Sequence, residues 1–338
     1  MENLLSSERL QEILTNFEQF KPILVVGDIG IDKYTLGEVK RISPEAPVPI
    51  IEVVDEWFKL GLAANISHNL KTLNVNSTLC GVIGNDQNAT SFEHLCEDSN
   101  LKTWGLVRSD DRPTIFKERV TTNTQQICRI DYEKNIPLTD EIEQQLLRRV
   151  EDFSEDHSCL ILEDYFKGTL TKNIIQSLIR FYRNKNKLVA IDPGRFTPPE
   201  YYRNASLLKP NLVEAKIMAE ALNSREKDPF KLAHFLAEKL SIEKIIITLG
   251  GEGMVLLDVK CDGKVHHIPT VANEVFDVSG AGDTAISLLT ASLEAGASLI
   301  EAAWIGNCGS GVVVGKKGTA TVNKAELIDF HHRLSEKL

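Results

Sequence analysis

Short runs of apolar, often β-branched residues recur along the chain and alternate with segments whose apolar positions repeat with the period of a helix. Five of these runs are predicted to be strands: 23–27, 77–83, 159–162, 188–192 and 244–249. Strands that alternate with helices form a mostly parallel sheet with helices on both faces, so we expect an α/β fold. Ligands of such sheets collect beyond the carboxyl ends of the strands, which makes polar residues there candidates for function.

Two stretches depart from this alternation. The run PIIEVV at 49–54, and the segments IFKERVTT and QICRIDY within 113–132, have the pattern of antiparallel strands with a turn at Asn123 and Thr124. We expect a small β-lid, formed by about residues 33–58 and 112–132, that folds over the main sheet. The exposed face of such a lid is able to pair with a second subunit, so a homodimer through the lid is a hypothesis.

Residues 1–20 have the pattern of an acidic, amphipathic helix and are predicted to extend one domain that spans residues 21–338. This segment lacks a basic start, and no apolar run reaches membrane-spanning length, so no secretion or membrane insertion is expected. The six cysteines are scattered without CxxC spacing, which favours reduced thiols in the cytoplasm. The formal net charge of −10 argues against a nucleic-acid or membrane partner and favours small-molecule chemistry.

The most informative segment is NEVFDVSGAGDTAIS at 273–287, in which Gly280-Ala281-Gly282-Asp283 precedes an amphipathic, helical pattern. Glycines at the start of a helix let backbone N–H groups approach an anion closely, and the helix dipole favours negative charge there. This arrangement predicts an anion hole for a transferring phosphoryl group. Asp283, beside that hole, is suited to accept the proton of an attacking hydroxyl.

Other interpretations of this segment remain open. Gly280 and Gly282 can form a plain tight turn, with Asp283 as a helix cap. GAGDTA also matches a dinucleotide fingerprint GxGxxA, with Glu301 near the position of a ribose-binding acid, but NEVFDVS is a poor candidate for the buried strand that should precede it. The run GVVVGKK at 311–317 has the wrong spacing for a Walker phosphate loop.

DVSGAGDT resembles the DTGAGD signature of the PfkB, or ribokinase-like, carbohydrate kinases, and GLAANISHNLKTLN resembles their GGAAN signature. The resemblance extends from about residue 23 to the last helix. The segments GDIGIDKY, RISPEAPVPI, EDYFKGTL, KPNLVEAK and VVVGKKGTATV look like D-glycero-β-D-manno-heptose-7-phosphate kinases of lipopolysaccharide biosynthesis. The resemblance implies a ribokinase-like fold and transfer of the γ-phosphate of ATP, with Mg²⁺, to the anomeric hydroxyl of that heptose, which yields the 1,7-bisphosphate.

The resemblance also implies roles for individual residues. Asp283 would be the catalytic base, and Gly280, Ala281 and Gly282 the anion hole. Sugar hydroxyls would bind Asp32, at the end of the first strand, with Gly61 and Asn65 beside it. The phosphate of the acceptor would bind Lys117, Arg119, Arg129 and Lys167. ATP would contact Asn211, Glu214, Thr248, Gly251, Gly253 and Asn307, with Glu214 holding Mg²⁺ through water and a monovalent cation near Asp277.

Each of these residues also has a purely structural interpretation. Asp32 is a typical turn residue, and Asn65 is typical of a helix start. Asn211 and Glu214 are typical of a solvated helix cap. The glycines can be turn residues, and the lysines and arginines can belong to an ordinary charged surface.

The chain departs from the family pattern at three positions. Leu62 stands where a second glycine is expected, Glu163 where a small residue precedes Asp164, and Arg195 where the heptose kinases have lysine. These departures leave two alternatives open: a kinase of another sugar or phosphosugar, or a sensor of sugar phosphates or nucleotides that has lost turnover.

Overall fold

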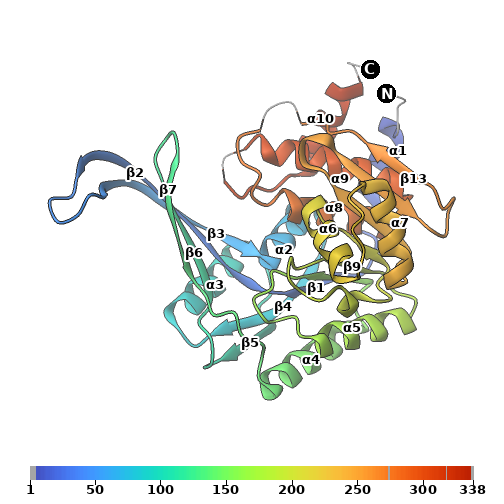
Figure 1. Cartoon of the computed structure of the whole chain (residues 1–338), viewed down its shortest axis with the longest axis horizontal. Helices are drawn as coiled ribbons and strands as arrows, with labels where there is room; N and C mark the ends of the chain where they lie inside the picture. Colours follow the sequence, from blue (N-terminus) through green and yellow to red (C-terminus); the bar gives the residue numbers. More distant parts are fainter. Residues whose placement is uncertain (1–4, 273–274, 317, 336–338) are drawn as a thin grey trace.

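The computed structural model describes residues 5–272, 275–316 and 318–335, which form two β-sheets with helices around the larger one (Figure 1). The larger sheet has nine strands in the order β13-β12-β11-β10-β9-β8-β1-β4-β5. Its strands from β5 to β11 are parallel, and β12 and β13 join antiparallel at one edge. The strands are β1 (Ile23–Gly27), β4 (Ser77–Gly84), β5 (Gly105–Ser109), β8 (Cys159–Glu163), β9 (Val189–Asp192), β10 (Leu207–Leu208), β11 (Lys244–Thr248), β12 (Met254–Asp258) and β13 (Val265–Ile268).

Neighbouring residues of each strand point to opposite faces of this sheet, and each face carries its own apolar core. In β1, Leu24 and Val26 pack into one core, whereas Ile23 and Val25 pack into the other. The first core also contains α4 (Asp140–Ser154), α5 (Lys172–Asn184), α6 (Leu212–Ala221) and α7 (Pro229–Leu240). The second contains α1 (Ser7–Asn16), α2 (Ala63–Thr72), α3 (Gln87–Asp98), α8 (Ala281–Glu294), α9 (Leu299–Val314) and α10 (Lys324–Ser335). The expected α/β architecture is confirmed.

The lid is a four-stranded sheet in the order β3-β2-β6-β7 that projects away from the body (Figure 1). Its strands are β2 (Ile29–Ile42), β3 (Pro49–Leu62), β6 (Ile115–Thr121) and β7 (Gln126–Tyr132). Only Asp28 separates β1 from β2, so Asp32 lies inside a lid strand, and its expected place at the end of the first strand was wrong. β2 continues almost directly from β1, so the base of the lid is joined to a strand inside the main sheet.

Within the described ranges, none of the helices has both the length and the apolar character needed to cross a membrane. The thiols of the six cysteines are free, with Cys128 and Cys261 exposed and the other four buried.

Candidate active site

The first turn of α8 provides backbone N–H groups for an anion. Gly280 precedes this helix with a φ of +80°, and a Cβ there would lie 2.9 Å from Nδ2 of Asn65, so both conformation and space require glycine. The N–H of Ala281 already donates to the carbonyl of Val278 at 3.2 Å. In the described structure no acceptor faces the N–H groups of Gly282 and Asp283, which therefore remain available for a ligand.

The carboxyl group of Asp283 lies in the interior and is held by two donors. Nδ2 of Asn65 donates to Oδ2 at 2.6 Å, and the hydroxyl of Tyr165 donates to Oδ1 at 2.9 Å. Burial raises the pKa of Asp283 to about 6, although both hydrogen bonds act in the opposite direction. No side chain caps the N-terminus of α8, so the alternative role of Asp283 as a helix cap is wrong.

The dinucleotide interpretation also fails. Residues 275–279 form no strand, and Asn273 and Glu274 lie outside the described residues. Glu301 forms a capping box with Ser298 at the start of α9 and pairs with Arg9 of α1 at 2.9 Å, so it has a structural role. In the Walker-like run, Gly311 lies within α9, and Lys317 is outside the described residues.

Asn65 is fixed behind the carboxyl group of Asp283 by a network of hydrogen bonds between α2 and α8. Nδ2 of Asn69 donates to the backbone carbonyl of Asn65 at 2.9 Å, and the hydroxyl of Thr284 donates to Oδ1 of Asn69 at the same distance. All three side chains are buried. Because buried amides with satisfied hydrogen bonds have few alternative positions, this network orients the donor that meets Asp283.

The loop after β8 is organised by Asp28, a residue that the sequence analysis did not single out. Its fully buried carboxylate accepts the backbone N–H groups of Tyr165, Lys167 and Thr169 at 3.0–3.1 Å. This arrangement places the Tyr165 hydroxyl against the carboxyl group of Asp283. The only sequence signal for Asp28 is an acidic residue directly after a buried strand.

A buried ion pair faces the first turn of α8. Nζ of Lys209 lies 2.7 Å from Oδ2 of Asp192, and a Cβ on Gly282 would lie 3.7 Å from each of these two atoms. Burial opposes the charge of Lys209, but the neighbouring carboxylate of Asp192 raises the pKa of the ammonium group. The ammonium group of Lys209 and the two available N–H groups thus converge beside Asp283. The sequence analysis did not single out Lys209.

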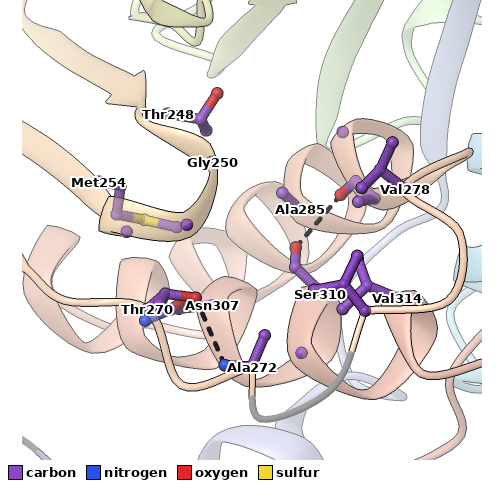
Figure 2. A pocket seen from close by; sticks show the side chains of 16 residues that line it. Thr248, Gly250, Met254, Thr270, Ala272, Val278, Ala285, Asn307, Ser310 and Val314 are labelled. Atoms are coloured by element: carbon purple, nitrogen blue, oxygen red, sulfur yellow. Dashed lines mark hydrogen bonds between the residues drawn. The ribbon is translucent and has the colours of Figure 1, made fainter.

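Two adjoining cavities open at this point. A polar one of about 670 Å³ is lined by Asp283 together with Lys209 and Glu214, and a mainly apolar one of about 290 Å³ is shown in Figure 2. Both are lined by Thr248, Gly250, Val278 and Gly282. The residues expected to bind nucleotide in the apolar cavity are Thr248, Gly251, Gly253 and Asn307. Asn307 donates to the carbonyl of Pro269 at 2.7 Å, which leaves its carbonyl oxygen for a ligand.

A family model described as pfkB family carbohydrate kinase matches residues 33–326. The chain belongs to the pfkB family. Two relatives are the bifunctional proteins HldE of Haemophilus influenzae (strain PittEE) and Shewanella piezotolerans, which are 38% and 39% identical over 320 and 328 residues. These alignments cover 95% and 96% of the present chain but 65% and 66% of the relatives, so the chain spans just under two thirds of their length.

Solved structures of pfkB-like fold agree with the architecture. Phosphofructokinase-2 from Escherichia coli, in complex with potassium, has a TM-score of 0.76 at 17% identity and covers 94% of this chain and 99% of its own. Ribokinase from Arabidopsis thaliana, complexed with ribose and ATP, has a TM-score of 0.70 at 17% identity, with coverages of 92% and 99%. These similarities confirm the expected ribokinase-like fold.

The expected pfkB NxxE pair forms a capping box at the start of α6. Oδ1 of Asn211 accepts the N–H groups of Val213 and Glu214 at 2.9 and 3.0 Å, and Oε2 of Glu214 accepts the N–H of Asn211 at 2.8 Å. The structural interpretation is therefore correct, yet both side chains also line the polar cavity. Burial, with the nearby charge of Asp192, raises the pKa of Glu214.

The sugar-binding candidates meet at the base of the lid. Oδ1 of Asp32 lies 2.6 Å from Nη1 of Arg119, and a Cβ on Gly61 would approach Oδ2 of Asp32 to 3.0 Å. The next residue, Leu62, has φ +59° and ψ −139°, a backbone conformation that only glycine adopts readily. Leu62, which replaces the second glycine of the pfkB pattern, therefore has a strained backbone as well as a bulkier side chain.

The four cations proposed for the acceptor phosphate do not form one cluster. Lys117 and Lys167 converge on Glu133, at 2.7 and 2.5 Å, whereas Arg119 pairs with Asp32. Arg129 is half exposed and pairs with Asp131 at 2.8 Å. Nζ of Lys117 also lies 3.4 Å from Asp131, so Glu133 and Asp131 link Lys167, Lys117 and Arg129, whereas Arg119 has a separate partner.

Glu163 occupies the carboxyl end of β8 and lines the polar cavity. Its side chain is 3% exposed, and in the described structure Oε2 has no hydrogen-bond partner. Burial, together with the charges of Asp192 and Asp283, holds the pKa of this carboxyl group well above its usual range. A second buried carboxyl group therefore lies near Asp283.

Proposed function

We propose that this chain is an ATP-dependent sugar kinase that transfers the γ-phosphate to the anomeric hydroxyl of D-glycero-β-D-manno-heptose 7-phosphate. The observation that carries the kinase activity is the position of Asp283, buried at the N-terminus of α8 where an apolar and a polar cavity meet. The apolar cavity suits a nucleobase, and the polar one suits phosphates and a sugar. The heptose acceptor is supported by the sequence segments that resemble heptose-7-phosphate kinases.

The proposed reaction uses groups of this chain in defined roles. With a pKa of about 6, Asp283 is mostly ionised at neutral pH and accepts the proton of the acceptor hydroxyl. The acceptor oxygen forms a bond to the γ-phosphorus as the bond to the ADP oxygen breaks, and the proton then leaves Asp283 for solvent. The N–H groups of Gly282 and Asp283 and the ammonium group of Lys209 stabilise the charge on the transferring phosphoryl group.

Mg²⁺ fits this site as an ion held mainly by water and phosphate. The described residues contain no group of three or more metal-binding side chains, which agrees with the preference of Mg²⁺ for few protein ligands. Glu214 and Asp192 offer two carboxyl groups at the polar cavity and would hold the hydrated ion. When bound, the ion would neutralise charge on the ATP phosphates. A monovalent cation near Asp277 stays a prediction.

We also propose that two subunits pair through the outer face of the lid, in the cytoplasm where ATP is supplied. Strand register places Phe58, Phe116, Ile130 and Tyr132 on one face, and Phe58, Ile130 and Tyr132 are at least 41% exposed. An apolar face of this kind is typical of a protein interface. Sedimentation velocity of wild type and Ile130→Glu tests the pairing; a wild-type monomer contradicts it.

The test of function is ADP release with Mg-ATP across D-glycero-β-D-manno-heptose 7-phosphate, fructose phosphates, ribose and adenosine. Asp283→Asn is the control and should lower kcat by about 10²–10⁴-fold while ATP binding persists. Turnover confined to the heptose phosphate supports the full proposal, and preference for another sugar retains the kinase with a different acceptor. If none of these acceptors leads to ADP release, the result would instead favour a sensor.

A further inference from the structure

Two exposed phenylalanines stand together at the polar cavity. Phe166, in the loop after β8, and Phe196, in the loop after β9, both line this cavity, and their rings meet edge to face with centroids 5.9 Å apart. They are 45% and 63% exposed. The guanidinium group of Arg195 lies over the Phe196 ring at 5.5 Å. A pair of half-exposed aromatic rings beside a cavity of otherwise polar character calls for a ligand with an apolar surface.

Phe166 has a backbone conformation that is unfavourable for phenylalanine. Its φ is +56°, in the left-handed region that bulky residues rarely adopt. The N–H of Phe166 donates to Oδ1 of Asp164 at 2.7 Å, while the flanking residues Tyr165 and Lys167 donate to Asp28. Two buried carboxyl groups thus impose the conformation. Because the ring remains half exposed, packing in the core does not explain why a strained phenylalanine is present.

The neighbours of Phe166 show which ligand its ring would meet. The preceding Tyr165 reaches Asp283, where the acceptor hydroxyl must lie, and the following Lys167 is a candidate for binding the acceptor phosphate. The triphosphate of ATP has no apolar surface, and the base has its own apolar cavity. The ribose of ATP is joined to the base in that cavity, so the apolar surface left for the rings is the face of the acceptor sugar that carries C–H groups.

We propose that Phe166 and Phe196 form an aromatic platform that binds the C–H face of the acceptor sugar and so contributes to acceptor specificity. This inference rests on the proposed kinase function. The platform favours acceptors with one ring or chain face free of hydroxyl groups, because an unpaired hydroxyl against an aromatic ring loses its hydrogen bond to water. Arg195 restricts the ring of Phe196 by stacking on it.

The experiment compares Phe166→Gly, Phe196→Ala and the control Phe230→Ala, which removes another exposed phenylalanine, 42% exposed on α7. We expect the KM for the acceptor to rise roughly 10-fold in each platform variant, with the KM for ATP unchanged. Phe166→Gly should also keep or raise the melting temperature, because glycine relieves the left-handed strain. A purely structural role of the ring predicts a lower melting temperature instead.

Other outcomes overturn the inference. An unchanged acceptor KM rejects it, and a simultaneous rise in ATP hydrolysis without acceptor would assign the rings to excluding water. Calorimetric binding of D-glycero-β-D-manno-heptose 7-phosphate and fructose 6-phosphate gives a readout that needs no turnover. If the wild type binds one of these sugars but does not phosphorylate it, the kinase proposal fails while the platform is still tested by the variants; if it binds neither, the platform is rejected.

Discussion

The hydroxyl of Tyr165 donates a hydrogen bond of 2.9 Å to Oδ1 of Asp283, on the opposite side of the carboxyl group from Asn65. Burial raises the pKa of Asp283 to about 6, and these two donors limit that rise. The acid is thereby kept near the pH at which a general base is both ionised and able to accept a proton. Tyr165 is thus a positioning residue of the candidate site, and its effect on the pKa of Asp283 is measurable.

Tyr165→Phe should shift the acid limb of the pH profile of kcat/KM to higher pH. In the wild type, kcat/KM should fall as pH drops through about 6, because Asp283 becomes protonated. Loss of the hydroxyl removes a donor that stabilises the carboxylate, so the limb should move up by roughly one pH unit. Tyr201→Phe, at a ring that packs beside Lys172, should leave the limb in place. An unmoved limb in Tyr165→Phe contradicts the assigned role.

Gly282→Ala should lower turnover without lowering thermal stability. A Cβ at this position meets nothing closer than 3.7 Å, and alanine is the better helix former, so the melting temperature should stay equal or rise. The added methyl group stands between the available N–H groups and Lys209, so kcat should fall about 10- to 100-fold.

Gly280→Ala is the matched comparison and should lower both kcat and the melting temperature. Its φ of +80° disfavours alanine, and the Cβ would press on Asn65. Thermal unfolding and initial rates of the two variants give the comparison. Full activity of Gly282→Ala would exclude an anion hole at this turn.

Leu62→Gly should cost less stability than Leu60→Gly. Both leucines are buried, at 7% and 2% exposure, so both substitutions remove apolar contacts. Only Leu62 has a strained backbone conformation that glycine adopts readily. Relief of this strain should offset about 1–3 kcal/mol of the lost free energy of unfolding. Guanidinium unfolding measures the difference, and equal losses for the two variants would mean that position 62 carries no strain.

Glu163→Gln should become progressively more stable than wild type as pH rises above 4.5. The folded pKa of Glu163 lies well above the unfolded value of 4.5, so between the two pKa values the unfolded chain ionises while the native protein retains the proton. Wild-type stability therefore falls with rising pH by up to about 1.4 kcal/mol per unit, whereas glutamine does not titrate.

Urea unfolding at several pH values checks this prediction. The control is Glu220→Gln, at an exposed position on α6, which should follow the wild type throughout. A constant difference between Glu163→Gln and wild type across the range would show that the carboxyl group is ionised in the folded protein.

Local patterns were sufficient for most of the fold. The strand predicted at 23–27 coincides with β1, because an uninterrupted β-branched run has few other structures available. The hairpin turn at Asn123 and Thr124 is likewise found between β6 and β7. The strand β2 was missed, since its polar and charged residues become strand only through pairing with β3 and β6.

The sequence by itself determined the α/β architecture, the family and the glycine-rich turn before Asp283, because these depend on periodicity and on residues that are close along the chain. Only the tertiary structure decided which distant groups meet: Tyr165 with Asp283, Lys209 with Asp192 beside Gly282, and Phe166 with Phe196. Burial and hydrogen bonding set the pKa of Asp283, and neither exists until strands far apart in sequence align their carboxyl ends.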